Sequence, residues 1–353
     1  MMMKMMRAQS YKRAKMRETQ LSSYDYFLPE GLIATKPVEP KGQAKLLVYD
    51  RKKDSIEHLH FSDLAQILPE CAIIFNDTKV IKARIYGQKD SGGKIELLLN
   101  QPLGGSNFSC FIKGSVKARQ NLEFPSALKA QVLELKDDGS RVVKITQNER
   151  ELGAHELFAI LCSIGHVPLP PYIKRADNKD DESWYQSIFA KNMGAVAAPT
   201  ASLHFDENML QELKQKHEHA FITLHVGAGT FKGVESENIL EHKMHSEYYE
   251  ISKSAKAIIN STQKLLAVGT TSTRTVEYFV RSGASSGECD LFLHPLNPPK
   301  RVDFLLTNFH LPKSTLIMLV ASFLGLEKTL ELYKKAVEMK YRFYSYGDGM
   351  LII

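Results

Sequence analysis

The pattern of apolar and polar positions changes twice along the chain. The first part contains two short apolar runs bounded by polar residues, which predict buried strands over 45–50 and 72–75. From about residue 78 to residue 164, shorter apolar segments alternate with polar positions and are separated by glycine-containing turns. This alternation predicts a small antiparallel β unit, either a barrel or a sandwich, that ends in a helix over 151–164.

Beyond residue 190 the pattern alternates between strands and helices. The predicted strands are residues 221–226, 265–268, 290–293 and 304–307, and the predicted helices are residues 207–216, 252–262, 273–282, 314–324 and 327–339. This order is typical of an α/β layer or barrel with a mainly parallel sheet. We therefore predict a barrel-like α/β domain of residues 21–77 and 165–353, a small antiparallel β-barrel domain inserted at 78–164, and a basic N-terminal extension over 1–20.

Composition and charge exclude several classes of protein. The chain has 353 residues and is 43% apolar, which is too apolar for a disordered protein. Its longest apolar run, residues 316–326, is about 11 residues, whereas a membrane span needs about 18, so no membrane partner is expected. Six of the 46 basic residues lie within residues 1–17, which hold no acidic residue, so the remainder is neutral and net charge does not argue for nucleic-acid binding.

The cysteines and the N-terminal tail bear on location. Cys71, Cys110, Cys162 and Cys289 are far apart and form no C-x-x-C pair, so neither a zinc ribbon nor an iron–sulfur cluster is indicated. Reduced thiols in a cytoplasm fit best. The tail lacks an apolar stretch, so it is interpreted as a weakly ordered extension and not as a secretory signal, with a nucleic-acid arm or a transit peptide as alternatives.

Polar residues follow four of the predicted strands. They stand at 76–78, 225–231, 269–274 and 307–314, and they are mostly hydroxyls, amides, glycines and histidines. Because α/β proteins bind ligands at the carboxyl ends of strands, these four segments predict a polar pocket lined by several loops. Ordinary turn and cap residues are the alternative for each segment alone.

Two of these segments contain glycine-rich or hydroxyl-rich loops. Gly227-x-Gly229-x-x-x-Gly233 has the wrong spacing for a dinucleotide site, although its glycines allow close approach of a ligand. The segment from Gly269 to Arg274 joins a strand to a helix start, an arrangement that suits a carboxylate, ribose or phosphate. A capped helix with its arginine on a solvated face is the alternative.

Histidines, small residues and aromatics add further candidates. The pair His242 and His245 does not match a zinc motif, so acid–base or hydrogen-bonding roles are favoured over a metal, with a buried, satisfied histidine as the alternative. Residues 194–205 are small enough to admit a flat ligand or to pack a helix tightly on a strand. Residues 341–348 mix aromatics with charges and suit either base stacking or an edge strand. No nucleophile, Walker or kinase signature is present.

Together these segments resemble one family, the S-adenosylmethionine:tRNA ribosyltransferase-isomerases of queuosine biosynthesis. The resemblance runs from residue 24 to residue 353 and is carried by residues 24–29, 76–80, 168–173, 198–205, 223–231, 242–249, 268–275, 306–314 and 341–348. It implies an α/β barrel-like domain with an inserted β-barrel. It also implies transfer and isomerisation of the ribosyl part of S-adenosylmethionine onto 7-aminomethyl-7-deazaguanine at the tRNA wobble position, which yields epoxyqueuosine, adenine and methionine.

The resemblance carries further expectations about partners. The co-substrate is S-adenosylmethionine, no prosthetic group is needed, and the partner is tRNA that carries 7-aminomethyl-7-deazaguanine in its anticodon. A cytoplasmic monomer is expected. The chain departs from the family pattern at residues 293–300, around residues 111–120 and at Trp184, where arginine is common. These departures concern the grip on tRNA.

The site residues are assigned on the same basis. Acid–base catalysis is expected from His204, His225 and His245. Arg274 and the loop from Thr270 to Thr273 are expected to hold the methionine carboxylate or the ribose. The expected substrate-binding residues are Asn76, Asp77, Thr200, Gly227, Gly229, Thr230, Thr270, Thr271, Ser272, Thr273, Arg274, Asn308, His310, Lys313, Arg342, Phe343, Tyr344, Tyr346 and Asp348. The competing function is a non-catalytic tRNA-binding protein on the same scaffold; a serine hydrolase lacks a positioned His–Asp pair.

Overall fold

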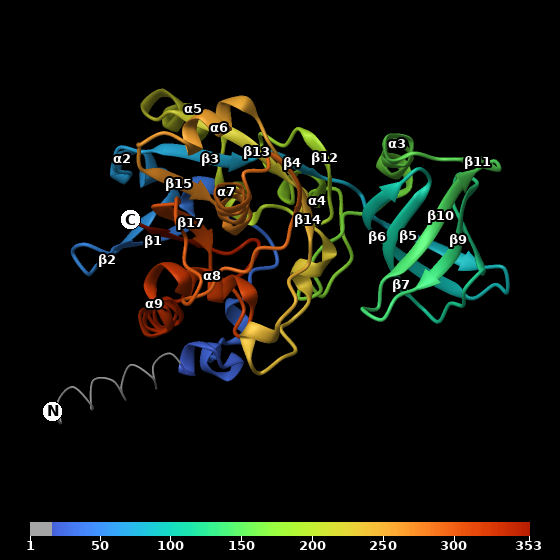
Figure 1. The fold of residues 1–353 in the computed structure, drawn as a ribbon, viewed down its shortest axis with the longest axis horizontal. Coiled ribbons are helices and arrows are strands. Elements are labelled where there is room, and N and C mark those ends of the chain that lie inside the picture. Colours follow the sequence, from blue (N-terminus) through green and yellow to red (C-terminus); the bar gives the residue numbers. More distant parts are fainter. Residues whose placement is uncertain (1–15) are drawn as a thin grey trace.

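The computed structural model describes residues 16–353, and most of the predicted basic extension lies outside them. Figure 1 shows two units, a large one built on a helix-covered sheet and a small one built of strands alone apart from one helix. The fold class predicted from the sequence is therefore confirmed. The domain boundaries proposed at residues 78 and 164 stay a prediction.

The large unit contains a nine-stranded sheet. In spatial order its strands are β16 (Ser286–Cys289), β14 (Glu247–Ile251), β13 (His219–Leu224), β3 (Ala72–Asn76), β15 (Leu265–Val268), β17 (Phe304–Asn308), β18 (Gly349–Ile352), β1 (Lys45–Asp50) and β2 (Ser55–His60). The central strands β13, β3, β15 and β17 run parallel, whereas β14, β16, β18 and β2 each pair antiparallel with a neighbour. Strands β1 and β18 also pair parallel, near one edge of the sheet. The sheet is thus mixed, and the expectation of a mainly parallel sheet holds in part.

Both faces of the sheet are buried. Along β3, Ile73 and Phe75 pack into one apolar cluster, and Ile74 packs into another on the opposite face. This explains why the strand reads as an unbroken apolar run. The covering helices are α2 (Leu64–Ile67), α5 (Glu207–Lys216), α6 (Lys253–Ile259), α7 (Thr270–Ser282), α8 (Thr315–Leu324) and α9 (Leu326–Glu338), and a short α4 (Asp181–Trp184) lies outside them.

Local sequence signals explain where several helices begin. Asp206, Ser252 and Ser314 each accept a hydrogen bond from a backbone N–H of the first turn of α5, α6 and α8. Helix α7 ends at Gly283, whose φ of 74° is readily adopted only by glycine. By contrast, α7 begins at Gly269 without any side-chain cap. The N–H groups of its first turn are therefore available to a ligand.

The small unit is a closed antiparallel barrel. Its strands are β5 (Arg84–Lys89), β6 (Lys94–Gly104), β7 (Asn107–Lys113), β8 (Asn121–Phe124), β9 (Leu128–Leu135), β10 (Arg141–Gln147) and β11 (Arg150–Glu151). Pairing of β10 with β9 closes six of them, and β11 adds to the edge of β10. Alternate residues such as Leu97, Leu99 and Val132 fill the core, with α3 (Ala154–Ile164) packed against it.

A short sheet links the two units. Strand β4 (Thr78–Val80) pairs with β12 (Asn192–Ala195), which precedes the return of the chain to the large sheet. One predicted element is wrong: residues 290–293 form no strand, and β16 ends at Cys289. Leu293 is nevertheless 1% exposed and belongs to the core beneath α8 and α9. The apolar residues of this segment are thus explained by a buried loop and not by a strand.

Candidate active site

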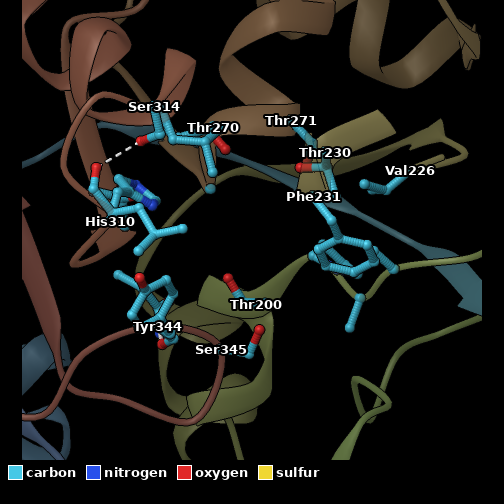
Figure 2. A pocket seen from close by; sticks show the side chains of 18 of the residues that line it. Thr200, Val226, Thr230, Phe231, Thr270, Thr271, His310, Ser314, Tyr344 and Ser345 are labelled. Atoms are coloured by element: carbon cyan, nitrogen blue, oxygen red, sulfur yellow. Dashed lines mark hydrogen bonds between the residues drawn. The ribbon is translucent and has the colours of Figure 1, made fainter. Parts of the chain in front are cut away.

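A cavity of about 280 Å³ opens at the carboxyl ends of the central parallel strands. Its walls come from the segments that follow β13, β15 and β17, together with residues 197–201, residues 344–345 and the loop that carries Tyr172. Figure 2 shows side chains from these separate segments facing one central space. The structure brings these predicted site residues to its wall: Thr200, Thr230, Thr270, Thr271, Asn308, His310, Lys313 and Tyr344.

Hydroxyl groups and a helix start form one side of the cavity. Thr270 and Thr271 occupy the first turn of α7, directly after Gly269, whose φ is 90°. Asn76 donates a hydrogen bond to the Thr271 hydroxyl at 3.2 Å and another to the Leu224 carbonyl at 3.1 Å. Asn76 therefore orients the Thr271 hydroxyl without lining the cavity itself. An uncapped helix N-terminus beside fixed hydroxyls is suited to a carboxylate or to ribose oxygens.

Another part of the wall carries His310 and a pair of tyrosines. The Thr307 hydroxyl lies 2.9 Å from Nε2 of His310, and burial lowers the pKa of His310 to about 3. The ring is therefore neutral near pH 7 and acts as a hydrogen-bonding group. Tyr172 and Tyr344 lie with ring centroids 4.2 Å apart, and both line the cavity. They give this side the flat apolar surface that an aromatic ligand requires.

The loop between the hydroxyls and the barrel is held from two sides. Its 3₁₀ turn, Ala228–Phe231, places Thr230 and Phe231 on the cavity wall. Glu247 accepts a hydrogen bond from the Gly227 N–H at 3.0 Å, and Asn100 of the barrel accepts one from the Ala228 N–H at 2.9 Å. Consecutive N–H groups are thus fixed by different units of the protein.

Arg274 supports this loop from within the protein. It is 7% exposed, ion-paired with Glu247, and donates to the carbonyls of Leu291 at 3.0 Å and Cys289 at 3.1 Å. Its guanidinium is therefore occupied by protein groups, and it lies outside the main cavity, on a small adjacent one. Gly229 sits beside the same cavity, where a Cβ atom would lie 2.5 Å from the His245 ring.

The three predicted catalytic histidines are dispersed around the cavity. His245 lines the small adjacent cavity, which shares Thr230, Lys232 and Leu316 with the main one. Burial, followed by the charge of Lys232, lowers the pKa of His245 below its usual value. Of the three predicted catalytic histidines, His245 is the one that lines a cavity sharing wall residues with the main one.

His204 and His225 lie farther into the protein. His204 stacks on Phe61 with ring centroids 3.9 Å apart, and burial lowers its pKa to about 3. It borders a separate small cavity that it shares with Tyr346. Nδ1 of His225 lies 2.8 Å from the Thr78 hydroxyl, and burial outweighs nearby Asp77 in lowering the pKa of His225. Neither ring lines the main cavity.

The remaining predicted residues are mostly structural in their contacts. Asp77 accepts hydrogen bonds from Thr223 at 2.6 Å and from Asn192 at 3.1 Å, on a separate groove. Ser272 is fully buried in α7, and Thr273 donates to the Gly269 carbonyl at 3.1 Å.

The aromatic stretch near the C-terminus is largely core. Phe343 is fully buried, and the Tyr346 hydroxyl donates to Asp181 at 3.3 Å. Asp348 accepts from the Arg342 N–H at 2.7 Å and from the Lys45 N–H at 2.9 Å, while burial raises the pKa of Asp348. Of this stretch's predicted residues, Tyr344 alone reaches the main cavity.

Comparison with known proteins identifies the family. A family model described as "Queuosine biosynthesis protein" matches residues 21–352. The chain belongs to the queuosine biosynthesis protein family. It is similar to the S-adenosylmethionine:tRNA ribosyltransferase-isomerase of Campylobacter fetus, with 68% identity over 94% of this chain and 98% of that protein. The protein of the same name from a Nitratiruptor species is 62% identical over the same shares.

A solved structure supports the same placement. The crystal structure of an S-adenosylmethionine tRNA ribosyltransferase from Thermotoga maritima matches with a TM-score of 0.52 and 31% identity. The match covers 94% of this chain and all of that one. It therefore spans both the large sheet and the barrel.

Sequence reasoning missed several residues of the site. Asn100 gave no signal because a polar residue in an alternating strand is normally solvent-facing. Tyr172 belongs to the stretch 168–173 that carried the resemblance, but it was not assigned to the site. Lys232, between Gly229 and Gly233, lines the cavity but is not among the predicted site residues.

Proposed function

We propose that this protein is an S-adenosylmethionine:tRNA ribosyltransferase-isomerase. It transfers and isomerises the ribosyl part of S-adenosylmethionine onto 7-aminomethyl-7-deazaguanine at the tRNA wobble position. The products are epoxyqueuosine in the tRNA, adenine and methionine. The observation that carries the proposal is the cavity of about 280 Å³, whose wall includes both an uncapped helix start and a pair of tyrosine rings in tilted contact. This volume is close to the lower end of the range for small-molecule sites, which is roughly 300 Å³.

The two sides of the cavity match the two ends of S-adenosylmethionine. The first turn of α7, with the hydroxyls of Thr270 and Thr271, suits the methionine carboxylate or the ribose oxygens. Tyr172 and Tyr344 suit the adenine ring, which needs a flat apolar surface. Asn308, His310 and Lys313 line the space between the walls and supply hydrogen bonds.

The chemistry requires a base close to the sulfonium. A base removes a proton from the ribose carbon next to the positively charged sulfur, whose charge makes that proton acidic. The bond to adenine then breaks and adenine leaves with the electron pair. The amine of the modified base attacks the ribose-derived fragment, and closure of the ring expels methionine with its sulfur electron pair restored.

His245 is the best-placed candidate for this base. Its lowered pKa keeps the ring neutral near pH 7 and able to accept a proton. The small cavity that it lines adjoins the main one, and the two share Thr230, Lys232 and Leu316 as wall residues. His204 and His225 remain predicted acid–base residues, but neither lines the main cavity.

The expected setting is a cytoplasmic enzyme that acts as a monomer without a prosthetic group, and S-adenosylmethionine is its co-substrate. Within residues 16–353, no helix is long and apolar enough to cross a membrane. In the same part of the chain, no group of three or more His, Cys, Asp or Glu side chains is arranged to hold a metal ion. Analytical ultracentrifugation of the purified protein tests whether it is a monomer.

The decisive experiment is an assay of the complete reaction. Purified protein is incubated with S-adenosylmethionine and tRNA that carries 7-aminomethyl-7-deazaguanine, and the digested nucleosides are examined by mass spectrometry. We expect a mass gain that matches epoxyqueuosine, with adenine released in equal amount. Binding of the tRNA without adenine release would instead support the non-catalytic tRNA-binding protein.

A further inference from the structure

Phe27 is an exposed aromatic side chain in a firmly anchored segment. It is 82% exposed, the highest value among the large apolar side chains of residues 16–353. Both of its chain neighbours pack against the core: Leu28 contacts the apolar cluster, and Tyr26 lies edge-on to Tyr333 with ring centroids 5.2 Å apart. The segment is therefore held in place while Phe27 itself is directed to solvent.

The segment around Phe27 is bound to residues that line the main cavity. The Tyr26 hydroxyl donates to the carbonyl of His310, whose side chain is on the left of the cavity in Figure 2. Asp25 forms an ion pair with Lys313 at 2.6 Å, and Lys313 lines the cavity. These contacts tie one end of the segment to the 310–314 loop.

The other end of the segment is tied to a second wall. Glu30 forms an ion pair at 2.8 Å with Lys174, two residues after Tyr172 of the cavity wall. Phe27 thus lies in sequence between two ion pairs that connect to different walls of the same cavity.

The chemistry of this rim is that of a nucleic-acid contact. Leu311, 40% exposed, lines the cavity mouth and adds a second exposed apolar side chain. Lys313 and Lys174 are paired with Asp25 and Glu30, but their side chains keep exposures of 45% and 77%, so both ammonium groups stay accessible from solvent to a phosphate. An exposed aromatic beside lysines is the usual means of holding an unstacked base and its backbone.

We propose that Phe27 is a stacking platform for a nucleobase of the RNA substrate, adjacent to the base that enters the cavity. This inference rests on the proposed function, because it requires an RNA substrate. It names a contact to the RNA strand outside the reaction cavity. A rim contact of this kind lowers the KM for tRNA without entering the chemical step.

The test compares three variants under steady-state conditions. Phe27→Ala removes the platform, Phe27→Trp retains it, and Val280→Ala removes an exposed apolar side chain near the far end of α7. With tRNA carrying the modified base, Phe27→Ala should raise the KM for tRNA about 5- to 150-fold. The kcat and the KM for S-adenosylmethionine should stay unchanged. Phe27→Trp and Val280→Ala should both behave like the wild type.

Three results would overturn the proposal. An unchanged KM for tRNA in Phe27→Ala, with an unchanged Tm, would show that no base stacks there. A raised KM for S-adenosylmethionine alone would assign Phe27 to the co-substrate. A change in sedimentation would assign it to contact between copies of this chain. Direct tRNA binding by the same variants keeps the test independent of turnover, so a wild type that binds tRNA without forming product would overturn the proposed function alone.

Discussion

The two units of the protein bury very different side chains. Within residues 84–151, the buried polar residues are Ser106, Ser109 and Ser140. The large unit instead buries many polar groups around its strand ends, among them Asn76, His204 and His310. Because burying a polar group costs free energy unless it is hydrogen-bonded, such a concentration is typical of a functional site. The barrel has an almost entirely apolar interior, whereas the cavity lies at the strand ends of the large sheet.

The barrel nevertheless reaches the cavity through one loop. Ala228 of the loop packs into the apolar core of the barrel, and its N–H is held by Asn100. Lys232, which lines the cavity, lies over the Phe111 ring of the barrel at 4.9 Å. The barrel therefore positions backbone of the cavity loop, while the residues that line the cavity come from the large unit.

The largest effect is expected from His245. Replacing it in His245→Gln should lower kcat about 10²- to 10⁴-fold, because general-base catalysis is lost while the bulk of the side chain is kept. Single-turnover release of adenine measures this. Glu134→Gln, an exposed position of the barrel, is the matched control and should leave kcat unchanged. A decrease of less than about tenfold in His245→Gln would remove this histidine from the mechanism.

The next effect concerns ion pairs in the two units. Glu247→Gln should lower the free energy of unfolding by about 3–5 kcal/mol, because it leaves the Arg274 charge buried without its partner. In the barrel, Glu151 pairs with Lys144 at side-chain exposures of 59% and 36%, so Glu151→Gln should cost at most about 1 kcal/mol. Urea denaturation of both variants provides the measurement. An equal loss of unfolding free energy in the two variants would contradict the expected difference between a buried and an exposed ion pair.

Acid should destabilise the large unit first. Burial lowers the pKa of His204 and of His310 to about 3, from the ordinary value of 6.5. Below pH 6.5 the unfolded chain binds protons that the folded rings do not, so stability is lost as the pH falls from 6.5 towards 3. The slope should be about 1.4 kcal/mol per pH unit for each ring.

The barrel offers an internal control for this pH dependence. Residues 84–151 contain no histidine, so amide protection there should persist on acidification after protection of the large sheet has weakened. Hydrogen exchange read strand by strand from pH 7 to pH 4.5 measures the difference. His310→Gln should reduce the slope, and an unchanged slope would show that this ring is not the source.

The smallest effect is expected from Asn100. Asn100→Leu leaves the Ala228 N–H without its acceptor, which costs about 1–3 kcal/mol. The loop then loses its position, so the KM for S-adenosylmethionine should rise while tRNA binding stays constant. Asn100→Asp keeps an acceptor and should restore the KM, and Gln101→Ala on the same strand is the control. A loss of tRNA binding with a normal KM for S-adenosylmethionine would make Asn100 an RNA contact.

Local patterns were sufficient for elements with strong periodicity or clear caps. The strand at 45–50 and the helix at 207–216 were predicted with the bounds that the structure has. The prediction of a strand at 290–293 was wrong, because an apolar run reports burial and cannot distinguish a strand from a buried loop. The antiparallel pairings of β2, β14, β16 and β18 are not predicted by the local pattern either, since strand direction depends on partners far away in sequence.

Residue types and their local spacing were enough to predict the family, the fold class and the hydroxyl-rich strand ends that line the cavity. Tertiary structure alone decided which polar side chains are free to meet a ligand. Arg274 and Thr271 are neighbours in the same helix, yet one is enclosed by Glu247 and carbonyls while the other faces the cavity. The partners of Arg274 are far from it in sequence. They come together around its charge, and exclude it from solvent, only when the chain has folded.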